Sequence, residues 1–333
     1  MVLYFAVCTV LVGMTHLLSA EEENRRFQFS KRLMGTDVQI TIDALEDDNP
    51  EPAVEAAFKE GKRLNKIFSD WDADSEISRF SRSSQSDQFF KMSKELFEVL
   101  AYSQELAHKS KGAFDITIGP LSRLWRIARH QGRLPEKKKI KETFERTGFQ
   151  KLVLQEEQIS GKLLHRGMVL DMGGIAKGYI ADRMLEVLKK KGFPRCLIDA
   201  GGDLTLGEPP RAQKGWRVQI GGISNSQIPA LELSNCAIAT SGDLEQYLQF
   251  EGKRYSHLID PRNGYAILGG SQVTMIAPNG MTADAHASAC LILGPQESRA
   301  LLSSVTNFSF YYLNKVDSAQ GVEIFELHKQ DTE

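Results

Sequence analysis

The stretch VLDMGGIAKGYIADRMLEVLKKKGFPRCLIDAGGDL, residues 169–204, has the pattern of a strand, a glycine turn, a helix and a second strand. An apolar run leads into Gly173 and Gly174, and a segment with amphipathic helical spacing follows. The second apolar run ends at another Gly-Gly-Asp, residues 201–203. Glycines between a strand and a helix allow close approach of the backbone, to a phosphate, a metal or the neighbouring chain.

Two familiar phosphate-binding motifs do not account for this turn. Gly173 and Gly178 have the spacing of a P-loop, but Tyr179 and Ile180 stand where that motif needs Lys and Ser or Thr. The sequence GGIAKG, residues 173–178, also differs from the G-x-G-x-x-G dinucleotide fingerprint. The turn therefore has to be interpreted from its physical properties.

Three interpretations of the turn remain open. A helix start presents unpaired N–H groups that attract anions, and Lys177 adds a cation one turn inside. The Gly174 carbonyl could equally face a metal. In a purely structural turn, Asp171 would cap the helix and Lys177 would lie in solvent.

A second acidic turn occurs in MIAPNGMTADAHASACLILG, residues 275–294. We expect Thr282 to cap a helix, which places Asp284 in its first turn. Asp284 would then stabilise the helix dipole by roughly 0.3–1 kcal/mol. Alternatively, Asp284 and Ser288 share one helical face and could together bind Mg²⁺, which uses one or two carboxylates together with substrate phosphates.

Two further polar segments are candidates for a site. His257 in YSHLIDPRNGYAI, residues 255–267, is either a general base or a structural histidine. Asp260 before Pro261 is expected to start a turn. The small residues from Thr240 to Asp243 form a loop that could line a pocket.

The order of elements favours an α+β fold. Residues 27–43 predict two strands joined at a glycine turn, and helices are expected over 51–71, 93–112 with Ser93 as N-cap, 121–129 and 135–146. Strand patterns dominate after residue 150, and two helices are expected near 284–293 and 297–305. We expect mixed or antiparallel sheets with packed helices in two lobes. Since no linker separates a helix-rich part at about 44–150 from a strand-rich part at about 151–333, residues 21–333 are predicted to form one domain.

Composition narrows the class of protein. The net charge of the 333 residues is −2, and no basic run is interleaved with aromatics, so a nucleic-acid partner is not expected. Residues 1–20 are apolar, end in Ser19-Ala20 and precede EEENRR, which predicts a secretory signal peptide or an N-terminal anchor. The separated Cys196, Cys236 and Cys290 are expected to be core residues rather than disulfide or zinc ligands.

Eight segments occur together and in order: MGTDVQITI, FSDWDADSEISRF, GAFDITIGPL, DMGGIAKGYIADRM, LIDAGGDL, ATSGD, HLIDPRNGY and VTMIAPNGMTADAHASACLILG. This set resembles the ApbE family of FAD:protein FMN transferases over almost the whole chain after residue 20. The resemblance implies two lobes around a flavin cleft, FAD as substrate and Mg²⁺ at its diphosphate. It also implies that FMN is attached through a phosphoester to a Thr or Ser of an exported or membrane electron-transport protein, with release of AMP.

The resemblance also assigns roles to individual residues. The residues implied to contact FAD are Met34, Trp71, Phe114, Asp115, Asp171, Lys177 and Leu258. The implied metal ligands are the Gly174 carbonyl, Asp284 and Ser288, with the Ala287 backbone nearby. Some members have an acid at the position of Lys177 and others an Asp at that of Ala287, so the coordination is expected to differ from theirs. The general base is either Asp284 or His257.

Two rival functions and the cellular context follow from the same resemblance. With water in place of the acceptor, the site would be an FAD pyrophosphatase that yields FMN and AMP. With no turnover, the protein would be a non-catalytic FAD-binding protein. The implied partners are acceptor subunits of membrane redox complexes of the NADH:quinone oxidoreductase type, and the implied location is the periplasm, free or anchored to the inner membrane.

Overall fold

The structure is a computed structural model that describes residues 24–84, 88–221, 228–242, 246–315 and 322–329. The predicted leader, residues 1–20, and Asp243 of the predicted loop lie outside these ranges. In the described ranges, none of the helices combines the length and the apolar character that a membrane span requires.

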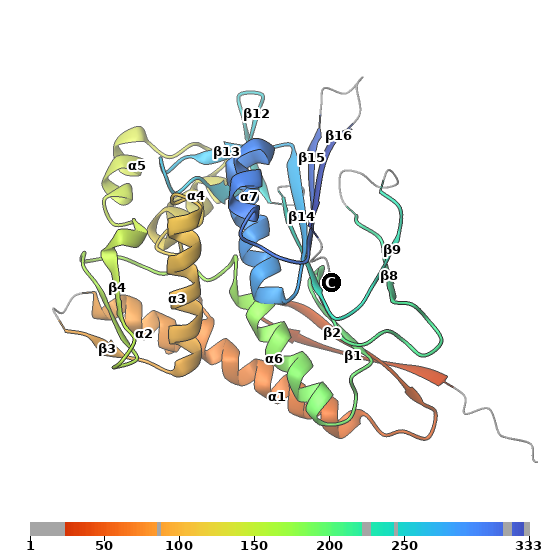
Figure 1. The fold of residues 1–333 in the computed structure, drawn as a ribbon. Helices are drawn as coiled ribbons and strands as arrows, with labels where there is room; N and C mark the ends of the chain where they lie inside the picture. Colours follow the sequence, from red (N-terminus) through yellow and green to blue (C-terminus); the bar gives the residue numbers. More distant parts are fainter. Residues whose placement is uncertain (1–23, 85–87, 222–227, 243–245, 316–321, 330–333) are drawn as a thin grey trace, which may run out of the picture.

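An eight-stranded antiparallel sheet is the centre of the fold (Figure 1). Its strands, in spatial order, are β1 (Asn24–Leu33), β2 (Thr36–Leu45), β6 (Cys196–Ala200), β7 (Asp203–Leu206), β10 (Ala237–Gly242), β14 (Ser271–Ala277), β15 (Phe308–Lys315) and β16 (Val322–Lys329). The N-terminal hairpin β1–β2 thus joins the same sheet as the last two strands, because β2 pairs with β6. This confirms the predicted α+β class with antiparallel sheets.

Three smaller sheets complete the strands. They contain β11 (Tyr247–Phe250), β12 (Lys253–Ile259) and β13 (Ala266–Leu268); β3 (Phe90–Lys91), β5 (Ser160–Leu163) and β4 (Leu152–Gln155); and β8 (Trp216–Val218) with β9 (Leu231–Leu233). The α-helices are α1 (Glu51–Phe68), α2 (Glu76–Ser83), α3 (Lys94–Lys109), α4 (Gly119–Gln131), α5 (Lys137–Phe144), α6 (Ala176–Lys190) and α7 (Gly280–Leu302).

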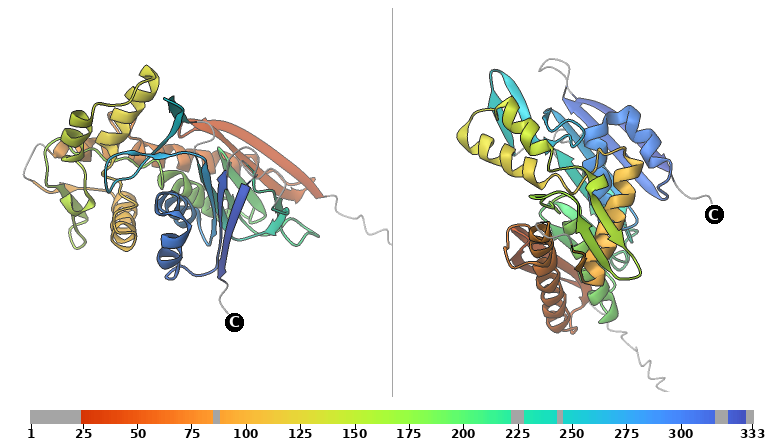
Figure 2. Two further views of the ribbon diagram at one scale, coloured as in Figure 1. Left: turned by 90° about the horizontal axis from the view of Figure 1, so that it is seen from above. Right: turned by 90° about the vertical axis from the view of Figure 1, so that its left-hand side faces the viewer.

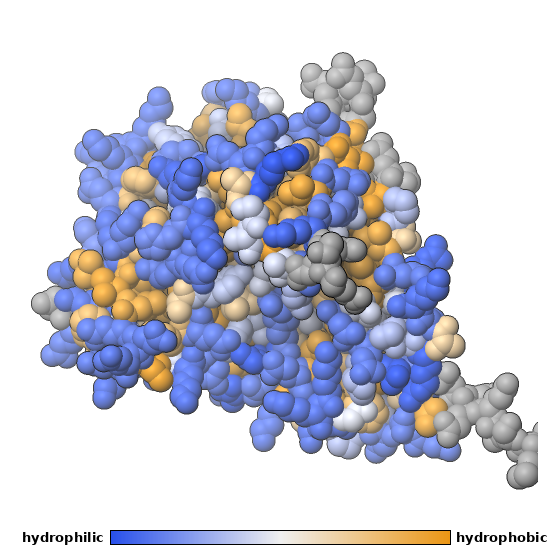
Figure 3. Space-filling model, in the orientation of Figure 1, coloured by the Kyte–Doolittle hydropathy of each residue, from blue (hydrophilic) through white to orange (hydrophobic). Residues whose placement is uncertain are grey.

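Helices α6 and α7 lie directly on the sheet, and α1 packs against α6. The turned views show the sheet on one side of the molecule and α3, α4 and α5 on the other (Figure 2). The apolar spacing of α1 predicts this packing, because Val54, Ala57, Leu64 and Phe68 are all buried in the main core. The face in Figure 3 is mostly hydrophilic, with smaller apolar areas.

Several local predictions are confirmed. Met34 and Gly35, at φ 55° and 75°, form the turn between β1 and β2. Ser93 caps α3 by accepting a hydrogen bond from Leu96 N at 3.2 Å. Cys196 and Cys290 are buried thiols, and among the described residues neither they nor Cys236 form a disulfide.

Of two predictions about the last helices, one is wrong and one is confirmed. Helix α7 begins at Gly280, and its cap is Asn279, whose Oδ1 accepts from Thr282 N at 2.8 Å. Thr282 is therefore inside the helix and Asp284 lies in its second turn. The two helices expected at 284–293 and 297–305 are both present within the span of α7, because Gly294, at φ 76° and ψ 171°, is not helical and separates them.

Candidate active site

The beginnings of α6 and α7 touch each other. A Cβ atom built on Gly178 would lie 2.0 Å from the Gly280 carbonyl oxygen, so only glycine allows this approach. The Asp182 carboxylate on α6 accepts hydrogen bonds from Gly280 N at 2.7 Å and Met281 N at 3.0 Å, and so caps α7. Burial raises the pKa of Asp182 to about 6, and these two N–H donors oppose that shift. The two turns singled out in the sequence therefore converge.

Lys177 lies at the centre of this junction. Its ammonium forms an ion pair with Asp203 at the start of β7, and Asp284 Oδ2 lies 3.5 Å away. Burial disfavours the charge on Lys177, but the Asp284 and Asp203 carboxylates outweigh it and hold the pKa of Lys177 above its ordinary value. Asp203 Oδ1 accepts from Thr240 N at 3.0 Å, which ties the pair to β10. Lys177 is therefore not the solvated lysine of the structural interpretation.

Helix α7 brings the side-chain oxygens of Asp284 and Ser288 to the same junction. The side chains of Asp284 and Ser288 are buried, and Gly178 N donates to Asp284 Oδ2 at 3.3 Å. Burial raises the pKa of Asp284 to about 6, while the Lys177 charge opposes that rise. A Cβ on Gly174 would lie 2.9 Å from Ser288 Oγ, so the glycine turn lies directly against Ser288.

Two cavities meet at Lys177. The central cavity, of about 410 Å³, is lined by residues that include Phe114, Asp115, Asp171, Gly174, His257, Leu258, Asp284 and Ser288. The outer cavity, of about 460 Å³, is lined by residues that include Met34, Phe68, Asp70, Trp71 and Met172. Gly173 and Lys177 line both cavities. The arrangement suits a ligand with two bulky halves and an anionic link, because the shared wall carries the cation.

The two acids predicted beside the glycine turn have local partners. Asp171 Oδ1 accepts from Gly173 N at 2.9 Å and shapes the turn, but it does not cap α6, which begins at Ala176. The Asp115 carboxylate accepts from Thr117 N and Oγ1 and from Phe149 N, all within 2.8 Å. Burial raises the pKa of Asp115, and these donors oppose the rise. Asp115 therefore organises the cavity wall.

His257 extends from β12 into the central cavity. Its Nδ1 lies 3.2 Å from the Gln246 carbonyl oxygen. Because a carbonyl can only accept, Nδ1 donates in this contact. The next residue, Leu258, packs partly against the main core. Asp260 accepts from Arg262 N at 2.9 Å and organises the turn after β12, as predicted.

The remaining predicted residues, Trp71 and Ala287, differ in their exposure. Trp71 is 75% exposed, and the Arg126 guanidinium lies 4.0 Å from its ring centroid. Ala287 is fully buried in the core and is not among the residues that line the central cavity. Its backbone carbonyl lies in the middle of α7, where helix geometry already directs it to a backbone N–H. The Ala287 side chain therefore offers no ligand to a metal.

Sequence reasoning missed Asp203 as a site residue. Its signal was the Gly201-Gly202-Asp203 motif, in which both glycines have positive φ, 68° and 94°. This left-handed turn reverses the chain between β6 and β7 and places Asp203 opposite Lys177. Within the described ranges, no group of three His, Cys, Asp or Glu side chains is arranged to hold a metal ion.

Comparisons with known proteins show which family the sequence and the fold match. The sequence matches the ApbE family model over residues 34–311. It is 28% identical over 298 residues to an FAD:protein FMN transferase of Klebsiella pneumoniae (strain 342), covering 88% of this chain and 90% of that protein. It is 30% identical over 247 residues to that of Escherichia coli (strain K12), covering 72% and 70%. The solved flavin transferase ApbE from Vibrio cholerae superposes with a TM-score of 0.80 at 25% identity, covering 91% and 97%.

Proposed function

The chain belongs to the ApbE family and is an FAD:protein FMN transferase, and we propose that it acts with Mg²⁺, attaches FMN to a Thr or Ser hydroxyl and releases AMP. The observation that carries the proposal is the position of Lys177 between two cavities. FAD consists of two nucleotides joined by a diphosphate. The nucleotides would occupy the two cavities, and the diphosphate would lie at Lys177 and the start of α6.

The residues present fit a magnesium ion. The Asp284 carboxylate, the Ser288 hydroxyl and the Gly174 carbonyl would hold it, since Mg²⁺ prefers oxygen ligands and takes one or two carboxylates together with substrate phosphates and water. Asp284 and Ser288 are buried one turn apart on α7, and Gly174 lies against Ser288. When bound, the ion would neutralise charge that develops on the phosphoryl oxygens. We leave Ala287 out of the ligand set because it is not among the residues that line the central cavity.

The chain's own residues would position the reaction and handle its proton. The acceptor hydroxyl attacks the FMN phosphorus, a new P–O bond forms, and the diphosphate P–O bond to AMP breaks. Lys177 is held charged by two carboxylates and would stabilise the negative oxygens. Asp284 Oδ2 already accepts from Gly178 N and contacts Lys177, and His257 lines the same central cavity. We therefore assign the hydroxyl proton to His257 rather than to Asp284.

The acceptor and the cellular location are further parts of the proposal. We infer that the acceptor is an exported or membrane-bound electron-transport subunit of the NADH:quinone oxidoreductase type. The apolar residues 1–20 support export to the periplasm, with the leader either cleaved or kept as an inner-membrane anchor.

A product analysis tests the proposal. Purified protein is incubated with FAD and the soluble flavin-bearing domain of such a subunit, in Mg²⁺ or in EDTA. We expect FMN on the target Thr by mass spectrometry, with one AMP per modified acceptor, in Mg²⁺ only. An acceptor with that Thr changed to Val is the control. AMP release at the same rate without any acceptor would instead identify an FAD pyrophosphatase.

A further inference from the structure

A third cavity lies beside the two assigned to FAD. This side pocket, of about 310 Å³, is lined by residues that include Arg82, Arg123, Ser78 and Gly167. It meets the outer cavity at Asp70 and Trp71, which line both. The FAD assignment leaves the side pocket without an occupant, although it opens next to the proposed cleft.

A row of three arginines runs from the side pocket to the central cavity. Arg123, Arg126 and Arg129 are spaced three apart on α4, so successive members are neighbours on the helix surface. Arg123 lines the side pocket, while Arg126 and Arg129 line the central cavity. The row therefore borders the whole path past the exposed indole of Trp71.

The arginine row has no carboxylate partner in the part of the chain that the structure describes. Arg63, Arg183 and Arg262 each bind a carboxylate within 3.0 Å. Among the residues that the structure describes, none of the three in the row has an ion pair within 4.0 Å. Arg126 instead lies over Trp71, and Arg129 Nη2 is 3.4 Å from Gln246 Oε1.

Asp70 and Asp171 are the acids between the side pocket and the central cavity. Asp70 is partly buried; burial and then Asp171 raise its pKa to about 6, while Arg126 and Arg123 oppose that rise. Asp171 already accepts from Gly173 N. The side pocket is lined by two guanidinium groups, those of Arg82 and Arg123, and by one carboxylate, that of Asp70. The side pocket is therefore positive, whereas acids also line the central cavity beside Arg126 and Arg129.

We propose that the arginine row and the side pocket dock an acidic segment of the acceptor polypeptide next to the hydroxyl that receives FMN, an inference that rests on the proposed function. Guanidinium groups pair well with carboxylates, and a positive side pocket both steers and orients an acidic partner. The phosphates of FAD do not account for Arg123, because it lines the side pocket and neither of the cavities that meet at Lys177. An extended segment advances at most about 3.3–3.6 Å per residue, so an acid several residues from the hydroxyl would reach the pocket.

Steady-state kinetics with Arg123→Glu tests this proposal. The acceptor is the soluble flavin-bearing domain of an NADH:quinone oxidoreductase-type subunit, used in its natural form and with the acids flanking the target Thr changed to amides. For the natural acceptor, we expect Arg123→Glu to raise KM about five- to tenfold with kcat within about twofold of wild type. The KM for FAD should not change. Lys62→Glu, an equal charge change on the exposed side of α1, should leave both KM values at wild type.

The amide form of the acceptor separates the outcomes. With the wild-type enzyme, the amide form should have a higher KM than the natural acceptor. With Arg123→Glu, the change to amides should raise the acceptor KM little further, because the same contact is already lost. An unchanged acceptor KM in Arg123→Glu, with normal transfer by the wild type, would overturn the docking proposal alone. A rise in the FAD KM instead would assign Arg123 to the nucleotide. If the wild type transfers no FMN, the proposed function fails and the docking proposal fails with it.

Discussion

Lys177 holds together the carboxylates of Asp203 and Asp284. It lies between Asp203 and Asp284, and Gly173 accompanies it along the wall shared by both cavities. In the metal-free protein, the ammonium offsets two buried negative charges. Lys177 therefore has a stabilising role in addition to its proposed contact with the FAD diphosphate.

Lys177→Met is expected to destabilise the metal-free protein by about 1–3 kcal/mol at pH 8, because it leaves two carboxylates close together without a cation. Without Lys177, the folded-state pKa of Asp284 should rise further above its unfolded value. A group whose folded-state pKa is raised contributes stability that is lost as pH rises through that pKa. The deficit in unfolding free energy of Lys177→Met relative to wild type should therefore be smaller at pH 5 than at pH 8. Urea denaturation in EDTA at pH 8 and at pH 5 measures this deficit in unfolding free energy. A deficit that grew towards pH 5 would contradict this account.

Asp284→Ala is expected to abolish transfer, lowering kcat/KM by at least about 100-fold, since it removes the only carboxylate in the proposed magnesium ligand set. The fold should stay near wild type, because Lys177 keeps Asp203 as its partner. Acceptor labelling and far-UV circular dichroism check the two statements. Asp47→Ala, at an exposed turn position, is the control. Wild-type activity of Asp284→Ala at limiting Mg²⁺ would refute the metal assignment.

At the scale of single residues, the order of the motifs in the sequence predicted most of the residues that meet in the structure. Asp171, Gly174, Lys177, Asp284 and Ser288 all line the central cavity, although they come from two turns more than a hundred residues apart in the chain. Ala287 does not, because its side chain faces the core, and helical phase alone separates it from Ser288. Individual contacts between distant side chains, such as Lys177 with Asp203, depend on strand pairing that the sequence does not reveal.

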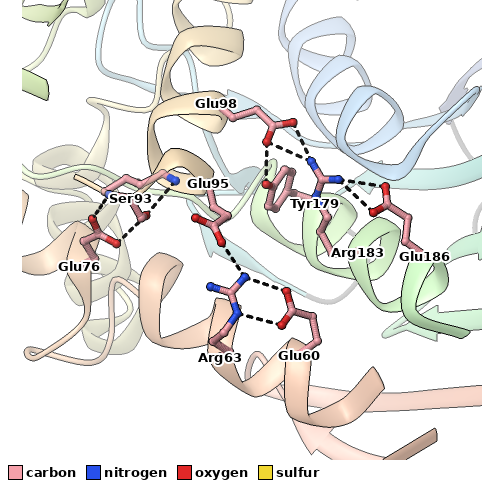
Figure 4. Close-up of polar contacts among 10 residues, drawn as sticks. Glu60, Arg63, Glu76, Ser93, Glu95, Glu98, Tyr179, Arg183 and Glu186 are labelled. Atoms are coloured by element: carbon pink, nitrogen blue, oxygen red, sulfur yellow. Dashed lines mark hydrogen bonds and ion pairs between the residues drawn. The ribbon is translucent and has the colours of Figure 1, made fainter. Parts of the chain in front are cut away.

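At the scale of elements, the contact between α6 and α7 places the two halves of the site. Helix α6 is also held from its other side, where Arg183 binds Glu98 of α3 at 2.9 Å and the Tyr179 hydroxyl donates to the same carboxylate (Figure 4). Arg63 of α1 likewise binds Glu95 of α3 (Figure 4). These partly exposed pairs orient the helices more than they stabilise them.

Gly178→Ala is expected to separate α6 from α7, because its Cβ would lie 2.0 Å from a backbone oxygen that cannot move independently. We expect a loss of about 2–4 kcal/mol of unfolding free energy and a loss of transfer activity even where the protein folds. Urea denaturation and acceptor labelling provide the two readouts. Gly221→Ala is the matched control, since a Cβ there meets no atom within 4 Å. Equal stability of the two variants would show that the helices do not depend on this contact.

Helix patterns predicted the type of element better than its boundary. The amphipathic spacing identified α1, α3 and α6, but Thr282 was predicted as the cap of α7 where Asn279 serves. Thr and Asn are both good caps, and the choice is made by Asp182 of α6, which binds the N–H groups of Gly280 and Met281. A tertiary contact of this kind is invisible to local reasoning. The short helix α2 was missed for a related reason, since it shows only two buried apolar positions, Ile77 and Phe80.

At the scale of the whole molecule, the eight-stranded sheet supports both helices of the site and both cavities. The sequence predicted the α+β class from early helices and late strands, but not that the hairpin β1–β2 completes the sheet beside β6. The order of strands depends on long-range pairing, and local alternation carries no information about it. The turn of this hairpin contributes Met34 to the outer cavity, where it lies with residues of α1 and α6.

The central claim is that the two helix starts hold a divalent cation against the diphosphate of FAD. The most direct test is ³¹P NMR of FAD bound to the protein, with Mn²⁺ titrated in place of Mg²⁺, because a paramagnetic ion broadens only nearby nuclei. We predict selective broadening of both diphosphate resonances in the wild type, and sharp resonances in Asp284→Ala at the same Mn²⁺ concentration with FAD still bound. Sharp resonances in the wild type, or equal broadening in both proteins, would contradict the account.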